Sequence, residues 1–170
     1  MLFWFRLFKA KLFASRRPRA NPLDCVPLGF RVGWSETLLG VTINSRYLDY
    51  MEVGRVAWME NLGLFKLAAR EKWLPLVASQ TIVYKRPIKK WQKAVLSTRL
   101  VCWDGRWLYS EHIFKVGDKI MASAVSRACV RSKEGLVAPA TVLAKLGHSE
   151  ASPEMPSGIA QWIAAEKLLY

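Results

Sequence analysis

The chain has 170 residues, a length that fits one domain with short extensions and excludes two full-sized domains. Apolar residues make up 52% of it, enough for a complete core, so a wholly disordered chain is excluded as well. The 26 Lys and Arg residues against 13 Asp and Glu residues give a formal net charge of +13, which favours anionic partners such as phosphates, anionic lipid surfaces, nucleic acid or acidic carrier proteins.

The first predicted element is an amphipathic helix within Met1–Phe13, where aromatic and aliphatic residues alternate with Arg6, Lys9 and Lys11. The uninterrupted apolar run is too short to span a bilayer, and charges inside it fit a secretory signal poorly. Aromatic rings interleaved with basic residues favour a helix that lies on an anionic membrane surface, with residues 1–19 as the contact. The alternative is a helix packed on its own domain or on a second subunit.

A strand and a long helix are predicted next. The strand is expected at Gly29–Trp34, which is short and β-prone. Over Asn44–Leu62, apolar residues recur at three- and four-residue steps and occupy more than half of the helix circumference, so the helix should be nearly enclosed. Asn44 is expected to be its N-cap and Gly63 to end it. Gly54, in the middle, should mark a close approach to a neighbouring backbone.

Four strands are predicted after a short amphipathic stretch, and tight turns link the last three of them. They are expected at Leu76–Tyr84, Ala94–Trp103, Arg106–Lys115 and Lys119–Arg131. The dipeptide Asp104-Gly105 is a strong hairpin signal between the second and third of these strands. Small residues on one face of the fourth strand suit a sheet that is pressed against a helix.

Two helices complete the expected secondary structure, at Val137–Leu146 and Ser157–Leu169. The chain therefore divides into a basic amphipathic segment (1–21), one α+β domain (22–148) and a linker with a C-terminal helix (149–170). A strand, an enclosed helix and an antiparallel meander in this order are typical of the hotdog architecture.

The cysteines and histidines give little sign of metal or disulfide chemistry. Cys25, Cys102 and Cys129 are widely spaced and odd in number, so we expect a reducing compartment and no disulfide framework. With only His112 and His148, and no HExxH motif, a catalytic zinc is not expected. We expect no metal and no cofactor.

Several segments carry a family resemblance. They are Trp34–Thr37 (WSET), Asn44–Arg55 (NSRYLDYMEVGR), Tyr84–Pro87 (YKRP), Cys102–Asp104 (CWD) and Gln161–Ile163 (QWI). Together they resemble the 4-hydroxybenzoyl-CoA thioesterase-like family, and most closely the branch that contains thioesterase superfamily member six and its bacterial relatives. The resemblance implies the hotdog fold, a sheet wrapped around a central helix. It also implies hydrolysis of acyl-CoA or acyl-carrier-protein thioesters, and a homodimer or larger homo-oligomer with a pocket between subunits.

The same resemblance implies where an oxyanion would be stabilised. Members of this family use backbone N–H groups at the start of the central helix, which here belong to Ser45, Arg46 and Tyr47. Unpaired amides and the helix dipole both favour an anion there. Asn44 would lie at the edge of the same site. The alternative is that Asn44 and Ser45 only cap a structural helix.

The activating carboxylate is harder to assign, because the family's aspartate has no counterpart between Thr37 and Asn44. Glu36 is the best substitute, and the alternative for it is a solvated loop residue. Asp49 is the second candidate, although with Arg46 and Glu52 it fits a charge ladder on the polar side of the helix.

Other polar residues are assigned structural or binding roles. Arg55 falls within the apolar arc of the helix and should be paired and structural, and His112 is also expected to be structural. The basic stretch that contains Lys85, Arg86, Lys89 and Lys90 is expected to bind coenzyme A phosphates or an acidic carrier, unless it is a solvated turn.

Partners and location complete the predictions. Nucleic acid is an unlikely partner because no recognition motif is visible. The expected location is cytoplasmic, either free or peripheral on the inner face of the membrane. The alternative to a thioesterase is a non-catalytic hotdog protein that binds acyl chains or partner proteins at a membrane surface.

Overall fold

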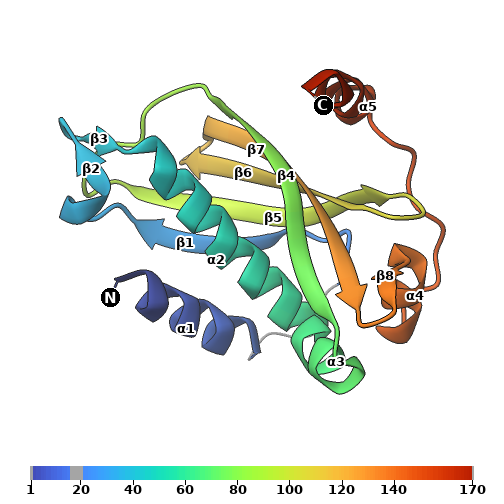
Figure 1. Cartoon of the computed structure of the whole chain (residues 1–170). Helices are drawn as coiled ribbons and strands as arrows, with labels where there is room; N and C mark the ends of the chain where they lie inside the picture. The colour runs from blue at the N-terminus through green and yellow to red at the C-terminus, as the bar shows by residue number, and fades with distance from the viewer. Residues whose placement is uncertain (1, 16–20, 170) are drawn as a thin grey trace.

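The computed structural model describes residues 2–15 and 21–169, and its centre is a curved antiparallel sheet. The strands run in the order β1-β5-β6-β7-β4, and a short β8 pairs with β7 (Figure 1). Their bounds are β1 (Val26–Arg31), β4 (Leu74–Tyr84), β5 (Lys93–Trp103), β6 (Leu108–Val116), β7 (Lys119–Ser132) and β8 (Gly135–Val137). The hairpin expected at Asp104-Gly105 joins β5 to β6, with the Asp104 amide donating to the Trp107 carbonyl at 3.0 Å.

The sheet curls around helix α2 (Asn44–Leu62), as expected for a hotdog fold. Ten of the 19 residues of α2 are buried, so the expected enclosure is confirmed. A Cβ atom at Gly54 would lie 2.7 Å from side-chain atoms of Leu96 and Thr98 on β5, so the helix does approach the sheet closely there, although the nearest atoms belong to side chains and not to the expected backbone. Gly63 ends the helix in the left-handed conformation, with φ of 79°.

The start of α2 differs from the prediction. Ile43 is the N-cap and Asn44 is the first helical residue, without a side-chain capping bond. The reason is tertiary: the Ile43 amide donates to the Glu36 carbonyl at 3.0 Å, and this bond holds the residue before the helix in an extended conformation. Two further elements were not predicted before it, the 3-10 turn Trp34–Glu36 and the small hairpin of β2 (Thr37–Leu38) and β3 (Val41–Thr42).

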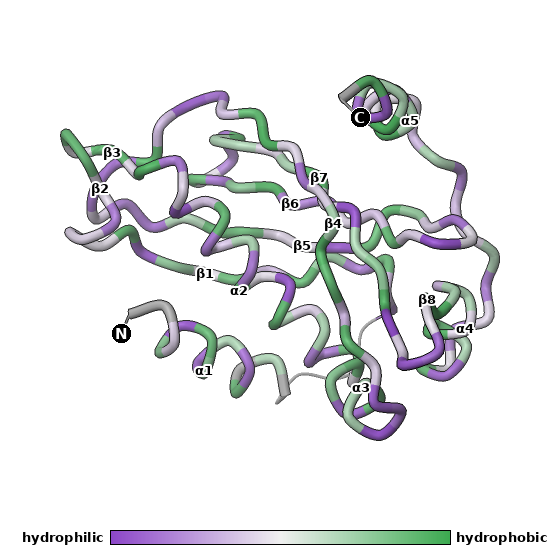
Figure 2. Tube along the Cα trace, viewed as in Figure 1, coloured by the Kyte–Doolittle hydropathy of each residue, from purple (hydrophilic) through white to green (hydrophobic). Residues whose placement is uncertain are grey.

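Helix α1 (Leu2–Ser15) packs alongside α2 (Figures 1 and 2). Ala10 and Ala14 are buried in the same apolar cluster as Val53 and Ala57 of α2. Small side chains at a four-residue spacing let the two helix backbones approach closely. The packed-helix alternative therefore describes one face of α1, while its outer face leaves large apolar side chains exposed (Trp4 73%, Phe5 54%, Phe8 67%).

The remaining helices lie near the ends of the sheet. They are α3 (Leu64–Glu71), α4 (Pro139–Lys145) and α5 (Ser157–Glu166), the last of which continues as a 3-10 turn at Lys167–Leu169. Ile159 of α5 packs with Cys102 of β5 and Tyr109 of β6, and Arg127 pairs with Glu166 at 2.8 Å, so the C-terminal helix is anchored to the sheet. Within the described residues, no helix combines the length and hydropathy needed to cross a bilayer.

Candidate functional site

The loop that carries Glu36 and the N-terminus of α2 lie side by side. The β2–β3 hairpin connects them, and the Ile43-to-Glu36 backbone bond closes it. Thr42 donates its hydroxyl to the Ile88 carbonyl at 2.8 Å and so attaches the same hairpin to the basic segment after β4. Three stretches far apart in the sequence therefore meet at one end of the central helix.

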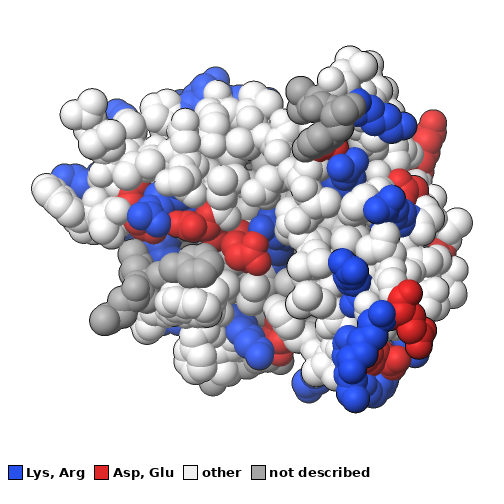
Figure 3. Space-filling view, in the orientation of Figure 1, with Lys and Arg blue, Asp and Glu red and all other residues white. Residues whose placement is uncertain are grey.

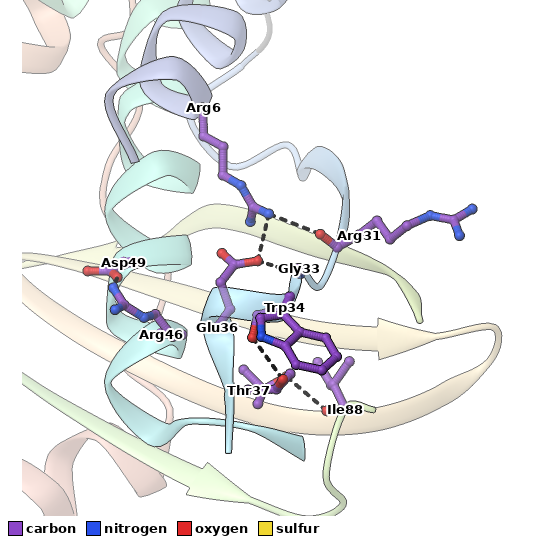
Figure 4. A network of polar contacts seen from close by, with 10 residues as sticks. Arg6, Arg31, Gly33, Trp34, Glu36, Thr37, Arg46, Asp49 and Ile88 are labelled. Carbon is purple, nitrogen blue, oxygen red and sulfur yellow. Dashed lines mark hydrogen bonds and ion pairs between the residues drawn. The ribbon is translucent and has the colours of Figure 1, made fainter. Parts of the chain in front are cut away.

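The Glu36 carboxylate is buried and oriented, with the residue only 7% exposed. Its Oε2 atom accepts from the Arg6 guanidinium at 2.8 Å and from the Gly33 amide at 2.6 Å (Figure 4). The Oε1 atom makes no hydrogen bond to any described residue. The solvated-loop alternative for Glu36 is therefore wrong: a cation from α1, thirty residues earlier, draws the carboxylate inward.

The amides at the start of α2 differ in their availability. The Arg46 amide already donates to the Ile43 carbonyl at 2.9 Å. The amides of Asn44 and Ser45 donate to no described residue. Of the three predicted oxyanion amides, that of Arg46 is thus occupied, whereas that of Ser45 has no partner among the described residues, and the Asn44 amide precedes it in the chain.

Two tyrosines line the same end of α2. The Tyr84 hydroxyl donates to the Asn44 carbonyl, and the Tyr47 hydroxyl accepts from the Ile88 amide, both at 3.4 Å. Their rings meet edge to face, with centroids 5.0 Å apart. Burial raises the pKa of both hydroxyls, so both stay neutral at physiological pH. The start of the helix is thereby tied to the end of β4.

Two carboxylates of α2, Asp49 and Glu52, form ion pairs within the helix. Asp49 accepts from Arg46 at 2.6 Å, with both side chains about two-fifths exposed (41% each). Glu52 pairs with Arg55, whose guanidinium also donates to Gln80 and Ser126 at 3.3 Å. These pairs form the expected charge ladder, visible as alternating red and blue atoms over α2 in Figure 3. Arg55 is buried and paired, as predicted.

His112 is structural. Its ring nitrogens lie 3.1 Å from the Thr98 hydroxyl and 2.6 Å from the Ser126 hydroxyl, and the residue is fully buried. Burial, and secondarily the Arg55 charge, lower the pKa of His112 to about 3. The imidazole is therefore neutral at physiological pH and is enclosed between helix and sheet.

The predicted basic residues surround the site rather than enter it. Lys85, Arg86 and Lys89 are exposed, and Arg86 donates to the Ile120 carbonyl at 3.2 Å. The Lys90 ammonium lies 3.9 Å from the centre of the Trp34 ring, which is 70% exposed. An aromatic ring and several cations next to the helix start form a surface suited to a nucleotide diphosphate.

Two contributors to this arrangement were not predicted. Arg6 was assigned to a membrane-facing segment, and no local pattern links it to Glu36, because the pair depends on how α1 packs. Trp34 was noted only as part of a motif. Its exposure is the signal that could have identified it, since a large exposed aromatic residue beside cations is typical of a ligand surface.

Comparisons with known proteins agree with the fold. The thioesterase-like superfamily matches residues 31–163. "Protein THEM6" of Xenopus laevis is 30% identical over 123 residues, 71% of this chain and 58% of the frog protein, so the chain spans little more than half of that relative. "Putative acyl-CoA thioesterase YneP" of Bacillus subtilis is 30% identical over 106 residues, 61% of this chain and 77% of the relative. The solved YbaW probable thioesterase of Escherichia coli shares the fold, with a TM-score of 0.67, 16% identity, and coverage of 72% and 96%.

Proposed function

Because this chain belongs to the thioesterase-like superfamily, we propose that it hydrolyses acyl thioesters of coenzyme A or of an acyl-carrier protein. The observation that carries the proposal is the juxtaposition of Glu36 with the free amides at the start of α2. A thioesterase needs a carboxylate that activates water and donors that stabilise the developing oxyanion. Both groups lie within the matched region, and the Ile43-to-Glu36 backbone bond joins the segments that carry them.

In the proposed mechanism, Glu36 acts as general base. Arg6 and Gly33 hold its Oε2 atom, which leaves Oε1 to accept a proton from water. The water oxygen attacks the thioester carbonyl carbon, and the Asn44 and Ser45 amides, with the helix dipole, stabilise the oxyanion. Collapse of the intermediate breaks the carbon–sulfur bond, and the proton held by Glu36 passes to the departing thiolate, so that the thiol and the carboxylic acid are released and the Glu36 carboxylate is regenerated. Asp49 stays paired with Arg46 outside the reaction.

The nucleotide end of the substrate has a matching surface in this proposal. Lys85, Arg86, Lys89 and Lys90 would hold phosphates, and the exposed Trp34 ring would stack on adenine. The acidic helix of a carrier protein would be attracted by the same charges.

A homodimer is part of the proposal, and strand β4 supports it. β4 ends the sheet, and no described strand pairs with its outer edge. Along it, large apolar side chains are exposed, among them Leu74 at 58% and Val83 at 55%. Open apolar edges are normally covered by another chain. Pairing of two β4 strands would extend the sheet across the dimer.

We also propose that the outer face of α1 contacts anionic membranes. It exposes Trp4, Phe5 and Phe8, with Lys9 and Lys11 beside them. Each basic residue near an anionic surface contributes about 1 kcal/mol. The inner face of the helix remains on the domain, so the protein would bind the surface as a folded body.

Substitution of Glu36 tests the enzymatic proposal. Release of free thiol from a panel of acyl-CoAs is followed with a chromogenic thiol reagent. We expect Glu36→Gln to lower kcat at least about 100-fold, the range for loss of a general base, and Asp49→Asn, the matched carboxylate control, to have little effect.

The same assay separates the alternative, a non-catalytic protein that binds acyl chains or partners at a membrane. That alternative is favoured by the tight hold of Arg6 on Glu36. Wild-type protein without thioester turnover across the panel would support it, as would turnover that Glu36→Gln leaves unchanged while no other carboxylate variant reduces it.

A further inference from the structure

A second pocket lies between α1, β1 and α2, away from the nucleotide-binding surface proposed above. It has a volume of about 650 Å³, within the range of sites that enclose small-molecule ligands. Apolar side chains from all three elements line it, among them Leu12 of α1, Leu28 and Phe30 of β1, and Val53 of α2. We call it the α1 pocket.

Two polar groups in the lining have no partner. The Nη1 atom of Arg6 and the hydroxyl of Tyr50 are both buried and make no hydrogen bond to any described residue. Tyr50 is 2% exposed, and the Arg6 guanidinium lies 4.8 Å from the centre of its ring. Unsatisfied buried donors are rare and call for an explanation, because each is destabilising. The two atoms come from residues that line the same pocket.

The charge of the lining has one sign. Arg6, Lys9 and Arg31 all line the pocket, and the nearest acidic residue, Glu36, lies outside the lining beside Arg6 and Tyr50, with its charge paired to Arg6. Glu36 occupies a different nitrogen of Arg6, Nη2, so it leaves Nη1 available. Burial raises the pKa of Tyr50 far above its ordinary value, and its hydroxyl therefore remains a protonated donor at physiological pH.

We propose that the α1 pocket binds a single-chain amphiphile with a carboxylate head, a long-chain fatty acid. The hydrocarbon chain lies against the apolar lining, and the carboxylate accepts from Arg6 Nη1 and the Tyr50 hydroxyl. An anionic head satisfies both donors, and Lys9, which also lines the pocket, adds favourable charge. The site shares Arg6 with the proposed thioesterase site, where the Nη2 atom of the same guanidinium holds Glu36, but fatty-acid binding does not depend on thioester hydrolysis.

The probe for this site is cis-parinaric acid, an 18-carbon carboxylate that fluoresces in apolar surroundings, titrated into the full-length protein without membranes. We expect saturable binding at one site per chain, displaced by laurate at least tenfold more effectively than by dodecanol, which has the same chain length without the charge. Hydrogen bonds to charged groups are among the stronger ones in proteins. Arg6→Met should therefore weaken binding about 10- to 100-fold and Tyr50→Phe about tenfold.

Lys11→Met is the matched control, because it removes the same charge from α1 at a residue outside the pocket lining. It should change the affinity less than about twofold. Equal displacement by laurate and dodecanol, or affinity that neither Arg6→Met nor Tyr50→Phe reduces, would overturn the proposal. If Arg6→Met does not fold, Tyr50→Phe and the comparison of laurate with dodecanol decide it.

The outcome is distinguishable from that of the thioesterase assay. Glu36 is not part of the pocket lining, and Glu36→Gln removes a negative charge beside Arg6, so this variant should keep or strengthen fatty-acid binding while it loses turnover. Binding without any turnover in the wild type would refute the proposed enzyme and leave this site standing. Turnover without carboxylate-selective binding would do the reverse.

Discussion

Replacing Gly54 by alanine tests how closely α2 is enclosed by the sheet. The added Cβ would lie 2.7 Å from both Leu96 Cδ2 and Thr98 Oγ1, closer than real Cβ contacts. Leu96 has rotamers available, but Thr98 is held by His112 at 3.1 Å, so its retreat would leave a buried polar group unpaired. Overpacking costs about 1–3 kcal/mol, and a lost buried hydrogen bond costs about 1–3 kcal/mol more.

These costs oppose a gain from helix propensity. Alanine in place of glycine stabilises a helix interior by about 1 kcal/mol. We therefore expect a net loss of about 2 kcal/mol in the free energy of unfolding, which for a chain of this size lowers Tm by about 4–8 °C. Thermal unfolding followed by circular dichroism measures the change.

The matched control is Gly158→Ala in α5, where an added Cβ would meet nothing within 4 Å. Its Tm should stay the same or rise slightly, because only the propensity term acts. An unchanged or raised Tm for Gly54→Ala would refute the reasoning, since it would mean that the helix and β5 are further apart than described.

Three other predictions concern assembly, membrane contact and pH. Val83→Lys on the open edge of β4 should convert a dimer to a monomer in light scattering, and a stable wild-type monomer would contradict the proposed dimer. The double variant Trp4→Ser/Phe8→Ser should reduce pelleting with anionic vesicles, whereas Leu168→Ser, at another highly exposed residue, should not. Equal pelleting of the wild type and both variants would exclude α1 as the contact. His112 has a folded pKa of about 3 against about 6.5 unfolded, so the unfolded state binds the extra proton and stability falls as pH drops below 6.5, by about 1.4 kcal/mol per unit. This part of the slope should be absent in His112→Gln, as measured by urea unfolding at pH 4 to 7.

The local patterns of the sequence were sufficient for the long elements. The range of α2 was predicted at both ends. Its apolar periodicity stops before Gly63, and glycine readily adopts the left-handed conformation that ends a helix. The edges of the long strands were located to within two or three residues by their turns. The β2–β3 hairpin and β8 were missed, since strands of two or three residues carry no periodic signal.

The site was predictable only in part, because long-range contacts decide it. Glu36 was selected by elimination, as the only acid between the first strand and Asp49, but its burial depends on Arg6. The N-cap was assigned to Asn44 from its residue type, whereas the backbone bond from Ile43 to Glu36 determines where the helix begins. Residue propensities predict that a helix begins near Asn44, but the packing of α1 and of the β2–β3 hairpin determines how the site residues are arranged.

The polar network around His112 also has a consequence for how the sheet assembles. His112 lies directly opposite Thr98 of β5 and Ala124 of β7. Ser126 is two residues after Ala124 and therefore lies on the same face of β7. If β6 slipped by one residue against its neighbours, the imidazole would move to the other side of the sheet and lose both hydroxyl partners. Apolar side chains of similar size would tolerate such a slip far better than a histidine that needs two partners. The network therefore favours a single register of β6 with β5 and β7 during folding.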